Sequence, residues 1–295
     1  RGREARELTS QADAHRSTGA KRPRARGRNL PMGKVLLAID VGNTHTVIGV
    51  YDGDTLVRHW RVLSEPGRTA DEYGVLIWNL YRSSGLAMEP WLATEPDTTD
   101  IVVSSVVPPM TKVVEDLCHA YFHTDPLVIG PGVKTGMPIL YDNPKEVGAD
   151  RIVNAVAAYE RFRDVCIVVD FGTATTFDCV SHRGEYLGGV ITPGLGIALD
   201  ALVTKTAKLP KVELVKPQRV VGKNTVHAIQ SGIVYGYVAL VDGLVERVRD
   251  EIGRGAHVIA TGGFASLIAP ESQTIEAVDE FLTLEGLRLI HRRNQ

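Results

Sequence analysis

The chain has 295 residues, of which 44% are hydrophobic and 23% are charged, and its formal net charge is −2. This length suits two domains better than one core, and the near-neutral charge argues against an electrostatic nucleic-acid binder. No apolar run in the sequence reaches the length expected of a membrane span. The three cysteines form no Cys-x-x-Cys pair, so neither a zinc nor a redox motif is indicated, and a reducing cytoplasm is the simplest setting.

Residues 1–32 form a basic extension that differs from the rest of the chain. The segment is rich in Arg, poor in apolar residues and without periodicity, which predicts disorder. It lacks the apolar segment of a secretory signal. A nucleic-acid-binding arm or a targeting peptide is one interpretation, and an upstream extension without a structural role is the other. The second is favoured, because basic tails are weak evidence without a folded basic face.

Leu36 to Val57 reads LLAIDVGNTHTVIGVYDGDTLV. Two apolar runs separated by a turn, followed by an Asp-Gly hairpin signal, predict an antiparallel meander over 35–40, 46–51 and 55–63. A cap at Thr69 predicts a helix to about Ser84. The continuous apolar run 101–107 predicts a buried strand, a Pro-Pro start predicts a helix over 108–122, and 127–129 predicts a short strand.

The second half repeats this pattern. Val168 to Ser181 reads VVDFGTATTFDCVS, and a superposition without a gap places Asp170 on Asp40, Gly172 on Gly42 and Thr176 on Thr46. Helices are predicted over 150–162, from 193 to about 204, from an Asn-Thr cap at 224–225 to about 252, and over 281–290, with a strand over 257–260. Each half therefore predicts a mixed sheet covered by helices, and the domain prediction is 33–145 and 146–295.

Glycine-rich turns after strand ends predict a phosphate site, because such turns let backbone N–H groups approach an anion. Residues 42–44 and 172–173 supply two such loops, and 261–263 supplies a third. A carboxylate at the end of a buried strand is costly unless something binds it, so Asp40 and Asp170 are expected to hold cations such as Mg²⁺ beside phosphate. The alternative is that Asp and Gly merely end the strands. The paired occurrence and the third loop favour a site.

These features resemble a known family. The duplicated Asp-x-Gly meander resembles the actin, hexokinase and Hsp70 ATPase superfamily. The segments DVGNT, GADRIVNAVAA, DFGTATTFD, GGVITPGLGIALDAL and ATGG, in that order, resemble type III pantothenate kinase from about Gly33 to the C-terminus. The resemblance implies an α/β fold of two duplicated actin/hexokinase-like (ribonuclease H-like) domains. Each would be a mixed five-stranded sheet flanked by helices, with a cleft between the two.

The family resemblance also implies an activity, which is ATP-dependent phosphorylation of pantothenate to 4'-phosphopantothenate, the first step of coenzyme A biosynthesis. Asp150 is then the proton acceptor, Asp170 the ligand of a monovalent cation (potassium or ammonium), and Asp40 a contact of Mg-ATP, directly or through water. A homodimer is implied, with no nucleic-acid or membrane partner. The implied ATP-binding residues are Asp40, Val41, Gly42, Asn43, Thr44, His45, Thr46, Val47 and Thr173, and the implied substrate-binding residues are Tyr141, Gly148, Ala149, Asp150, Arg151 and Thr225.

Some of these roles have structural alternatives. Asp150 follows a Gly-Ala pair and opens a helix, where an acidic residue is common without any catalytic role. Arg151 suits the carboxylate of pantothenate, but it equally suits a structural salt bridge. Four residues of the long helix suit a subunit interface or, alternatively, the core, namely Val234, Tyr237, Val238 and Val241.

Two other functions compete with this assignment. The fold also permits another small-molecule kinase, such as a sugar kinase, and a non-catalytic regulator that binds nucleotide. Phosphoryl transfer needs a group that orients the accepting hydroxyl, whereas a regulator needs no base in its cleft. Asp150 therefore separates an enzyme from a regulator.

Overall fold

The computed structural model describes residues 35–84 and 99–295. The basic extension 1–32, predicted to be disordered, lies outside the described residues. The first half contains β1 (Val35–Val41), β2 (His45–Asp52), β3 (Thr55–Leu63), α1 (Ala70–Ser83), β4 (Thr99–Ser105), α3 (Pro108–Leu117) and β5 (Leu127–Val128). Its five strands form one sheet in the order β3-β2-β1-β4-β5. β1 to β3 pair antiparallel, whereas β4 and β5 join in parallel, so the sheet is mixed as predicted.

The second half repeats this topology. Its elements are α4 (Ala149–Phe162), β6 (Cys166–Phe171), β7 (Ala174–Val180), β8 (Tyr186–Pro193), α5 (Leu195–Thr204), α6 (Thr225–Ile252), β9 (His257–Thr261), α7 (Ala265–Ile268), β10 (Ala277–Val278) and α8 (Leu282–Arg293). The sheet order is β10-β9-β6-β7-β8, with the meander β6-β7-β8 antiparallel and β9 and β10 parallel. Two sequence segments therefore build the same five-stranded sheet twice.

Local signals explain where the helices begin. Thr69 caps α1 through a capping box with Glu72, and the Asn224 side chain accepts the N–H of His227 at the start of α6. The prediction for 108–122 was partly wrong, because the α-helix ends at Leu117 and the chain continues as a π-helical turn, Cys118–Phe122.

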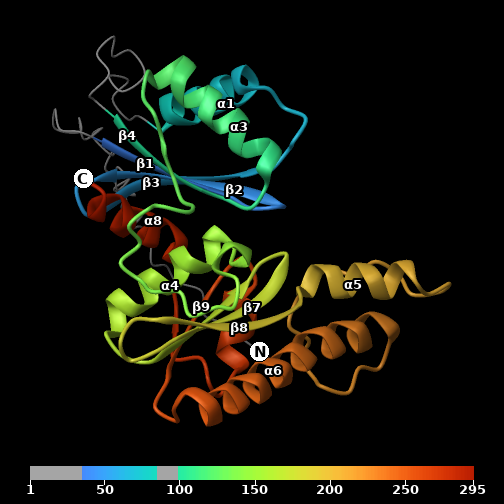
Figure 1. The fold of residues 1–295 in the computed structure, drawn as a ribbon. Helices are drawn as coiled ribbons and strands as arrows, with labels where there is room; N and C mark the ends of the chain where they lie inside the picture. The colour runs from blue at the N-terminus through green and yellow to red at the C-terminus, as the bar shows by residue number, and fades with distance from the viewer. Residues whose placement is uncertain (1–34, 85–98) are drawn as a thin grey trace, which may run out of the picture.

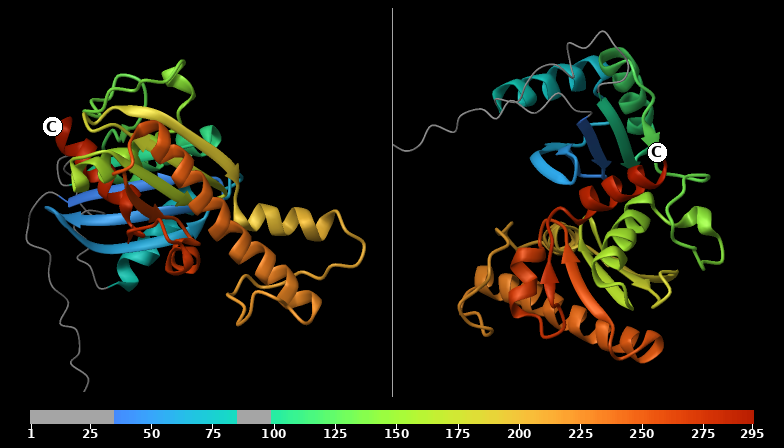
Figure 2. Two further views of the ribbon diagram at one scale, coloured as in Figure 1. Left: turned by 90° about the horizontal axis from the view of Figure 1, so that it is seen from below. Right: turned by 90° about the vertical axis from the view of Figure 1, so that its left-hand side faces the viewer.

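The molecule is layered, with helices outside and between the two sheets. Figure 1 shows α1 and α3 over one face of the first sheet, α4 and α8 between the sheets, and α6 beyond the second sheet. Three separate clusters of buried apolar side chains fill these three spaces. The right-hand view of Figure 2 shows α8 and α4 side by side in the middle layer. The two sheets therefore share the α4–α8 layer, and it fixes how they face each other.

α6 is a core helix on one side. It is long and apolar enough to cross a membrane by length and composition alone, a test that the core helix of a globular protein also passes. Val234, Tyr237 and Val241 are buried against the second sheet, and Val238 packs beside them. The core alternative therefore holds for these residues, and the suggestion that they serve an interface was wrong.

The strand register also corrects the superposition of the two repeats. Asp40 pairs with Val47 across β1 and β2, whereas Asp170 pairs with Thr176 across β6 and β7. The first turn is therefore one residue longer than the second. Thr176 is equivalent to Val47, and the superposition without a gap was out by one residue after the turn.

Candidate active site

A cleft with a volume of about 590 Å³ lies between the ends of the two central meanders. This volume is in the range of small-molecule sites. The cleft is lined by the loops after β1, β6 and β9 and by the first turns of α4 and α5. Of the residues assigned from the sequence, it is lined by Asp40, Gly42, Asn43, Thr44, His45, Val47, Asp150, Asp170 and Thr173.

The glycine loops of the two halves touch across this cleft. The hydroxyl oxygens of Thr44 and Thr173 lie 2.8 Å apart, so one threonine from each half meets its counterpart. The first loop is closed by the Gly42 N–H, which donates to the carbonyl of His45 at 3.1 Å. Two residues of the predicted ATP segment, Val41 and Thr46, are buried beneath this loop rather than among the residues that line the cleft.

Three carboxylates converge on the floor of the cleft. Each residue keeps some exposure, but burial beneath the loops raises the pKa of Asp40 to about 8 and that of Asp170 to about 7. The negative charge of Asp150 adds to both pKa shifts, and burial also raises the pKa of Asp150 itself. Closely spaced carboxylates cannot all remain ionised without a compensating cation. The floor therefore favours positive charge.

Asp170 is held on two sides by the second half. The Asn154 amide on α4 donates to Asp170 Oδ2 at 3.1 Å, and the Thr283 hydroxyl on α8 donates to Asn154 Oδ1 at 2.7 Å. On the other side, Gly262 has φ +89°, and a Cβ there would lie 2.4 Å from Asp170 Oδ1. Only glycine adopts that backbone angle easily, and only glycine leaves room for the carboxylate. The third glycine loop therefore packs directly against Asp170.

Asp150 lies in the first turn of α4, where the helix N-terminus faces the cleft. Its Oδ1 accepts the N–H of Arg151 at 2.8 Å, and the N-cap, Gly148, supplies no side-chain cap. A Cβ at Gly148 would lie 2.5 Å from that same oxygen. Gly148 thus allows the carboxylate to lie across the helix terminus, where backbone N–H groups favour negative charge.

Arg151 points away from the cleft lining and into the second half. Its Nε donates to Asp178 Oδ1 at 2.7 Å, and the Tyr186 hydroxyl donates to the same oxygen at 2.8 Å. Tyr141 packs against Tyr186, with ring centroids 6.4 Å apart. Arg151 therefore has a structural acid as its partner, although its buried Nη2 has no hydrogen-bond partner within the described chain.

The cleft lining does not include Tyr141, Gly148, Ala149 or Arg151, and Thr225 lies on a different surface altogether. It lines a separate hollow of about 520 Å³ between α5 and the start of α6, together with Leu202 and Asn224. No residue lines both this hollow and the cleft. Within one chain, the structure does not bring Thr225 together with the other substrate-segment residues.

Several residues around the site were not predicted from the sequence, namely Arg61, Asn154, Asp178 and Thr283. For Arg61 a signal existed, because the hairpin at Asp52-Gly53 fixes the register of β2 with β3 and places Arg61 opposite Val47. Paired residues share a face of a sheet, so Arg61 must face the cleft if Val47 does. Asn154 lies one helical turn beyond Asp150, on the same face of α4. Nothing local marks Thr283, since only tertiary packing brings α8 beside α4.

The donor set fits a cation held partly by ligand oxygens. Among the described residues, no group of three or more His, Cys, Asp or Glu side chains is close enough to hold a metal ion. Neither Asp40 nor Asp170 forms an ion pair anywhere in the described ranges, and their pKa values are raised first by burial and then by the negative charge of Asp150. Mg²⁺ typically takes one or two carboxylates and completes its shell with water and substrate phosphate. The two carboxylates of this site, Asp40 and Asp170, match that pattern.

Comparison with known proteins agrees with this geometry. The family model described as type III pantothenate kinase matches residues 36–247. The type III pantothenate kinase of Geobacter sulfurreducens is 57% identical over 88% of this chain and 100% of its own length, and that of Anaeromyxobacter sp. (strain K) is 58% identical over the same shares. The solved structure of the ethanolamine utilization protein EutJ from Carboxydothermus hydrogenoformans shares the fold, with a TM-score of 0.53 and 15% identity over 89% of this chain and 92% of that one. The chain belongs to the type III pantothenate kinase family.

Proposed function

We propose that the cleft between the two halves is where this family member transfers the terminal phosphoryl group of ATP to pantothenate, giving 4'-phosphopantothenate in the first step of coenzyme A biosynthesis. One observation carries the proposal. Asp40, Asp150 and Asp170 share one cleft with glycine loops from both halves. Phosphoryl transfer needs positioning of the phosphates and neutralisation of their charge, together with a group that orients the hydroxyl.

The phosphates of ATP bind to the glycine loops of both halves. The loop 42–46 and Thr173 form one side of this cradle, and the backbone of residues 261–263 forms another. Asp40 holds the Mg²⁺ of Mg-ATP, directly or through water. The contact between Thr44 and Thr173 supports this role, because a ligand there touches both halves at once.

Asp170 is the ligand of a monovalent cation, potassium or ammonium. Its carboxylate is fixed by Asn154 and by the Gly262 loop, and it has no cationic partner within hydrogen-bond distance in the described chain. When bound, such a cation supplies positive charge beside the phosphates. The check is a comparison of rates in potassium and sodium buffers, and equal rates would remove this role.

Asp150 accepts the proton of the pantothenate hydroxyl. Its raised pKa, caused first by burial, brings the carboxylate closer to the range of a working base. The substrate lies along the segment that contains Tyr141, Gly148 and Ala149. Arg151 supports this segment through Asp178, and its unpartnered Nη2 remains free to bind a polar group of the substrate.

The test is an ATP-consumption assay with and without pantothenate, together with Asp150→Asn. The asparagine keeps the size of the side chain but cannot accept the proton, so kcat should fall by about 10² to 10⁴ while ATP binding changes little. Asp142→Asn, which changes an exposed acid in the segment before α4, is the control. A kcat within a few-fold of the parent would rule out the base. ATP binding without any pantothenate-dependent turnover would favour a regulator.

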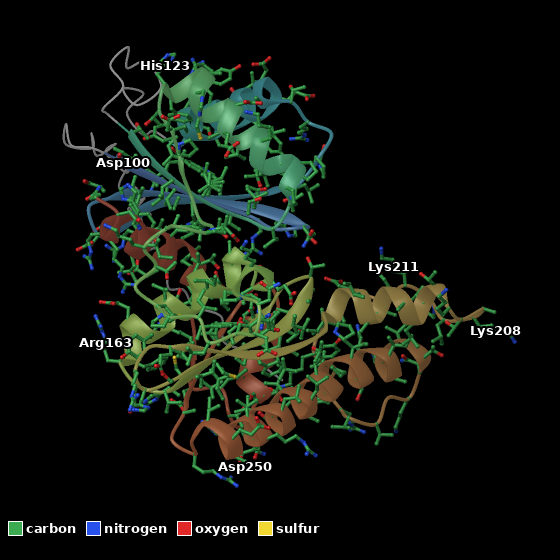
Figure 3. The ribbon with its side chains drawn as sticks, in the orientation of Figure 1. Asp100, His123, Arg163, Lys208, Lys211 and Asp250 are labelled. Carbon is green, nitrogen blue, oxygen red and sulfur yellow. The ribbon has the colours of Figure 1, made fainter. Side chains whose placement is uncertain are left out.

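We also propose a homodimer formed through the α5–α6 arm, defined as residues 195–232. Figure 2 shows this arm projecting from the second half, and Figure 3 places Lys208 at its outer end. Exposed apolar side chains gather along it, namely Ile197, Leu202, Val215, Val220, Val221 and Val226, with Val221 80% exposed. Such a patch on a projecting arm is typical of an interface.

A dimer would also account for the separate position of Thr225. That residue lies on the arm, so in a dimer the Thr225 of one subunit can reach the substrate bound in the cleft of the other. Val221→Asp should give a monomer in size-exclusion chromatography with light scattering, while Val75→Asp, on the exposed face of α1, should not. A monomeric parent would contradict the dimer.

The proposal also includes a domain division and a cellular setting. The division into residues 33–145 and 146–295 is supported by the presence of one complete sheet in each part. A cytoplasmic setting is supported by the three cysteines, Cys118, Cys166 and Cys179, all of which are buried and unpaired.

A further inference from the structure

Among the described residues that line the cleft, one cationic side chain stands with several acids. Five described residues that line it are acidic: Asp40, Asp150, Asp170, Asp200 and Glu280. Arg61, in β3, is the single Lys or Arg among the described lining residues. A site for a polyanion built mainly from carboxylates needs positive charge, and the protein itself supplies it at one position.

The position of Arg61 follows from the strand register. Asp40 pairs with Val47 and Val47 pairs with Arg61, so the three residues form one cross-strand row on the first sheet. The guanidinium extends from this row across the cleft. Its Nη1 lies 3.4 Å from where a Cβ on Gly263 would be, so it reaches the third glycine loop of the other half.

No carboxylate of the described residues binds Arg61. In the described ranges, no acidic group lies within ion-pair distance of it, although its charge acts to lower the pKa of both Asp40 and Asp170. Other arginines of the chain behave differently. Arg68 is bound by both oxygens of Glu65, and Arg151 is bound by Asp178. The exposed fork of Arg61 is therefore available to a ligand.

We propose that Arg61 is a phosphate-binding residue, which contacts the terminal phosphates of ATP from the first half and helps to neutralise their charge during transfer. The planar guanidinium donates two parallel hydrogen bonds to a phosphate, and such charge-assisted contacts are stronger than neutral ones. Positive charge near the transferred group is the main requirement of phosphoryl transfer. This inference rests on the proposal that the cleft holds ATP.

The alternative is that Arg61 only offsets the repulsion between Asp40 and Asp170. That role would affect every ligand of the cleft through the carboxylates and through Mg²⁺. A direct contact with the terminal phosphates instead discriminates between ATP and AMP, and it acts even when Mg²⁺ is removed. Nucleotide binding therefore separates the two explanations independently of turnover.

The experiment measures ATP and AMP binding to Arg61→Gln by calorimetry, with Mg²⁺ and with EDTA. ATP affinity should fall about tenfold or more under both conditions, while AMP affinity changes less than about twofold, since one charge-assisted contact is lost. Arg61→Lys should recover part of the loss, because it restores the charge without the fork. Arg58→Gln, an exposed arginine of the same strand, should bind as the parent does.

Equal loss of ATP and AMP affinity, or an effect that disappears in EDTA, would overturn the direct contact. No change in ATP affinity would overturn any phosphate role. The proposed function is judged separately, from pantothenate-dependent ATP consumption by the unmodified protein. If that activity is present while Arg61→Gln binds ATP normally, only the role of Arg61 fails.

Discussion

In the first half, the cross-strand row at the cleft reads Asp40, Val47 and Arg61, and in the second half the equivalent row reads Asp170, Thr176 and Ile191. The two rows start from the same carboxylate at the end of the central strand and finish differently, in an arginine that faces the cleft and in an exposed isoleucine. The backbone repeat therefore fixes where a carboxylate enters the cleft, while the neighbouring strands decide what surrounds it.

The supports of the two carboxylates also differ. Asp40 lies beside the Ser104 hydroxyl and the charge of Arg61. Asp170 is clamped between the Asn154 amide and the backbone at Gly262. The less constrained carboxylate of Asp40 suits the proposed Mg²⁺, which enters and leaves with ATP. The fixed carboxylate of Asp170 suits the proposed monovalent cation, which stays bound between turnovers. The comparison predicts that equivalent substitutions in the two halves have unequal effects.

The largest difference is expected between Asp40→Asn and Asp170→Asn. With Asp40 in its proposed role at Mg-ATP, loss of its carboxylate should lower kcat/KM about a thousandfold, because a catalytic metal contributes several kcal/mol to stabilising charge in the transition state. Asp170→Asn should cost about tenfold at saturating ATP and should abolish the response to potassium, since a monovalent ion supplies less charge.

Steady-state kinetics across magnesium and potassium titrations would measure both effects. Asp116→Asn, which removes a surface partner of Lys112, serves as the control for loss of an acid elsewhere. Equal losses of activity in the two cleft variants, both restored by magnesium, would show that the two carboxylates do not bind different cations.

Alanine substitutions in the glycine loops of the two halves should also lower the free energy of unfolding by unequal amounts. Gly262→Ala forces a Cβ into a positive-φ position, 2.4 Å from Asp170 Oδ1 and 2.7 Å from the Phe171 backbone. Gly42→Ala meets only the His45 carbonyl, at 3.0 Å. Urea denaturation should give a loss of about 3 kcal/mol for the former and about 1 kcal/mol for the latter. A Gly262→Ala protein as stable as Gly42→Ala would mean that the third loop is loose in solution.

Much of this comparison was available in the sequence. The repeated Asp-x-Gly turn predicted both meanders, the mixed sheets and the loops at the cleft, because apolar periodicity and turn residues are local signals. The clamp on Asp170 was not predictable in the same way. Asn154 and Thr283 are 129 residues apart and meet only because α8 packs against α4. The one-residue difference between the turns also escaped, since strand pairing rather than residue identity defines it.

The pH dependence of stability offers a third test. In metal-free protein the folded-state pKa values of Asp40 and Asp170, about 8 and about 7, lie above the ordinary value near 4. The folded state then binds more protons than the unfolded state between these limits, so the free energy of unfolding falls as pH rises. Where one of these carboxylates is protonated in the folded state and ionised in the unfolded state, it should contribute a slope of about 1.4 kcal/mol per pH unit.

The effects of the two substitutions should differ at the upper end of this pH range. Between pH 5 and 7 both Asp40→Asn and Asp170→Asn should flatten the decline, whereas between pH 7 and 8 only Asp40→Asn should still do so. Urea denaturation in EDTA at four pH values measures the slopes. Parallel curves for the parent and both variants would show that neither carboxylate is protonated in the folded protein.

The smallest predicted effect concerns the contact that joins the halves. Thr44 and Thr173 share a hydrogen bond of 2.8 Å between exposed hydroxyls, so each single change to Val should cost less than about 1 kcal/mol. The informative quantity is the coupling energy from the double variant, because the two threonines belong to different sheets.

A coupling of about 0.5 kcal/mol in the absence of nucleotide would mean that the contact between the two loops keeps the cleft closed before ATP binds. Additive effects would mean that the loops separate in solution and that ATP itself brings them together. In that case Thr44→Val and Thr173→Val should still each weaken ATP binding, which calorimetry on the two single variants would measure.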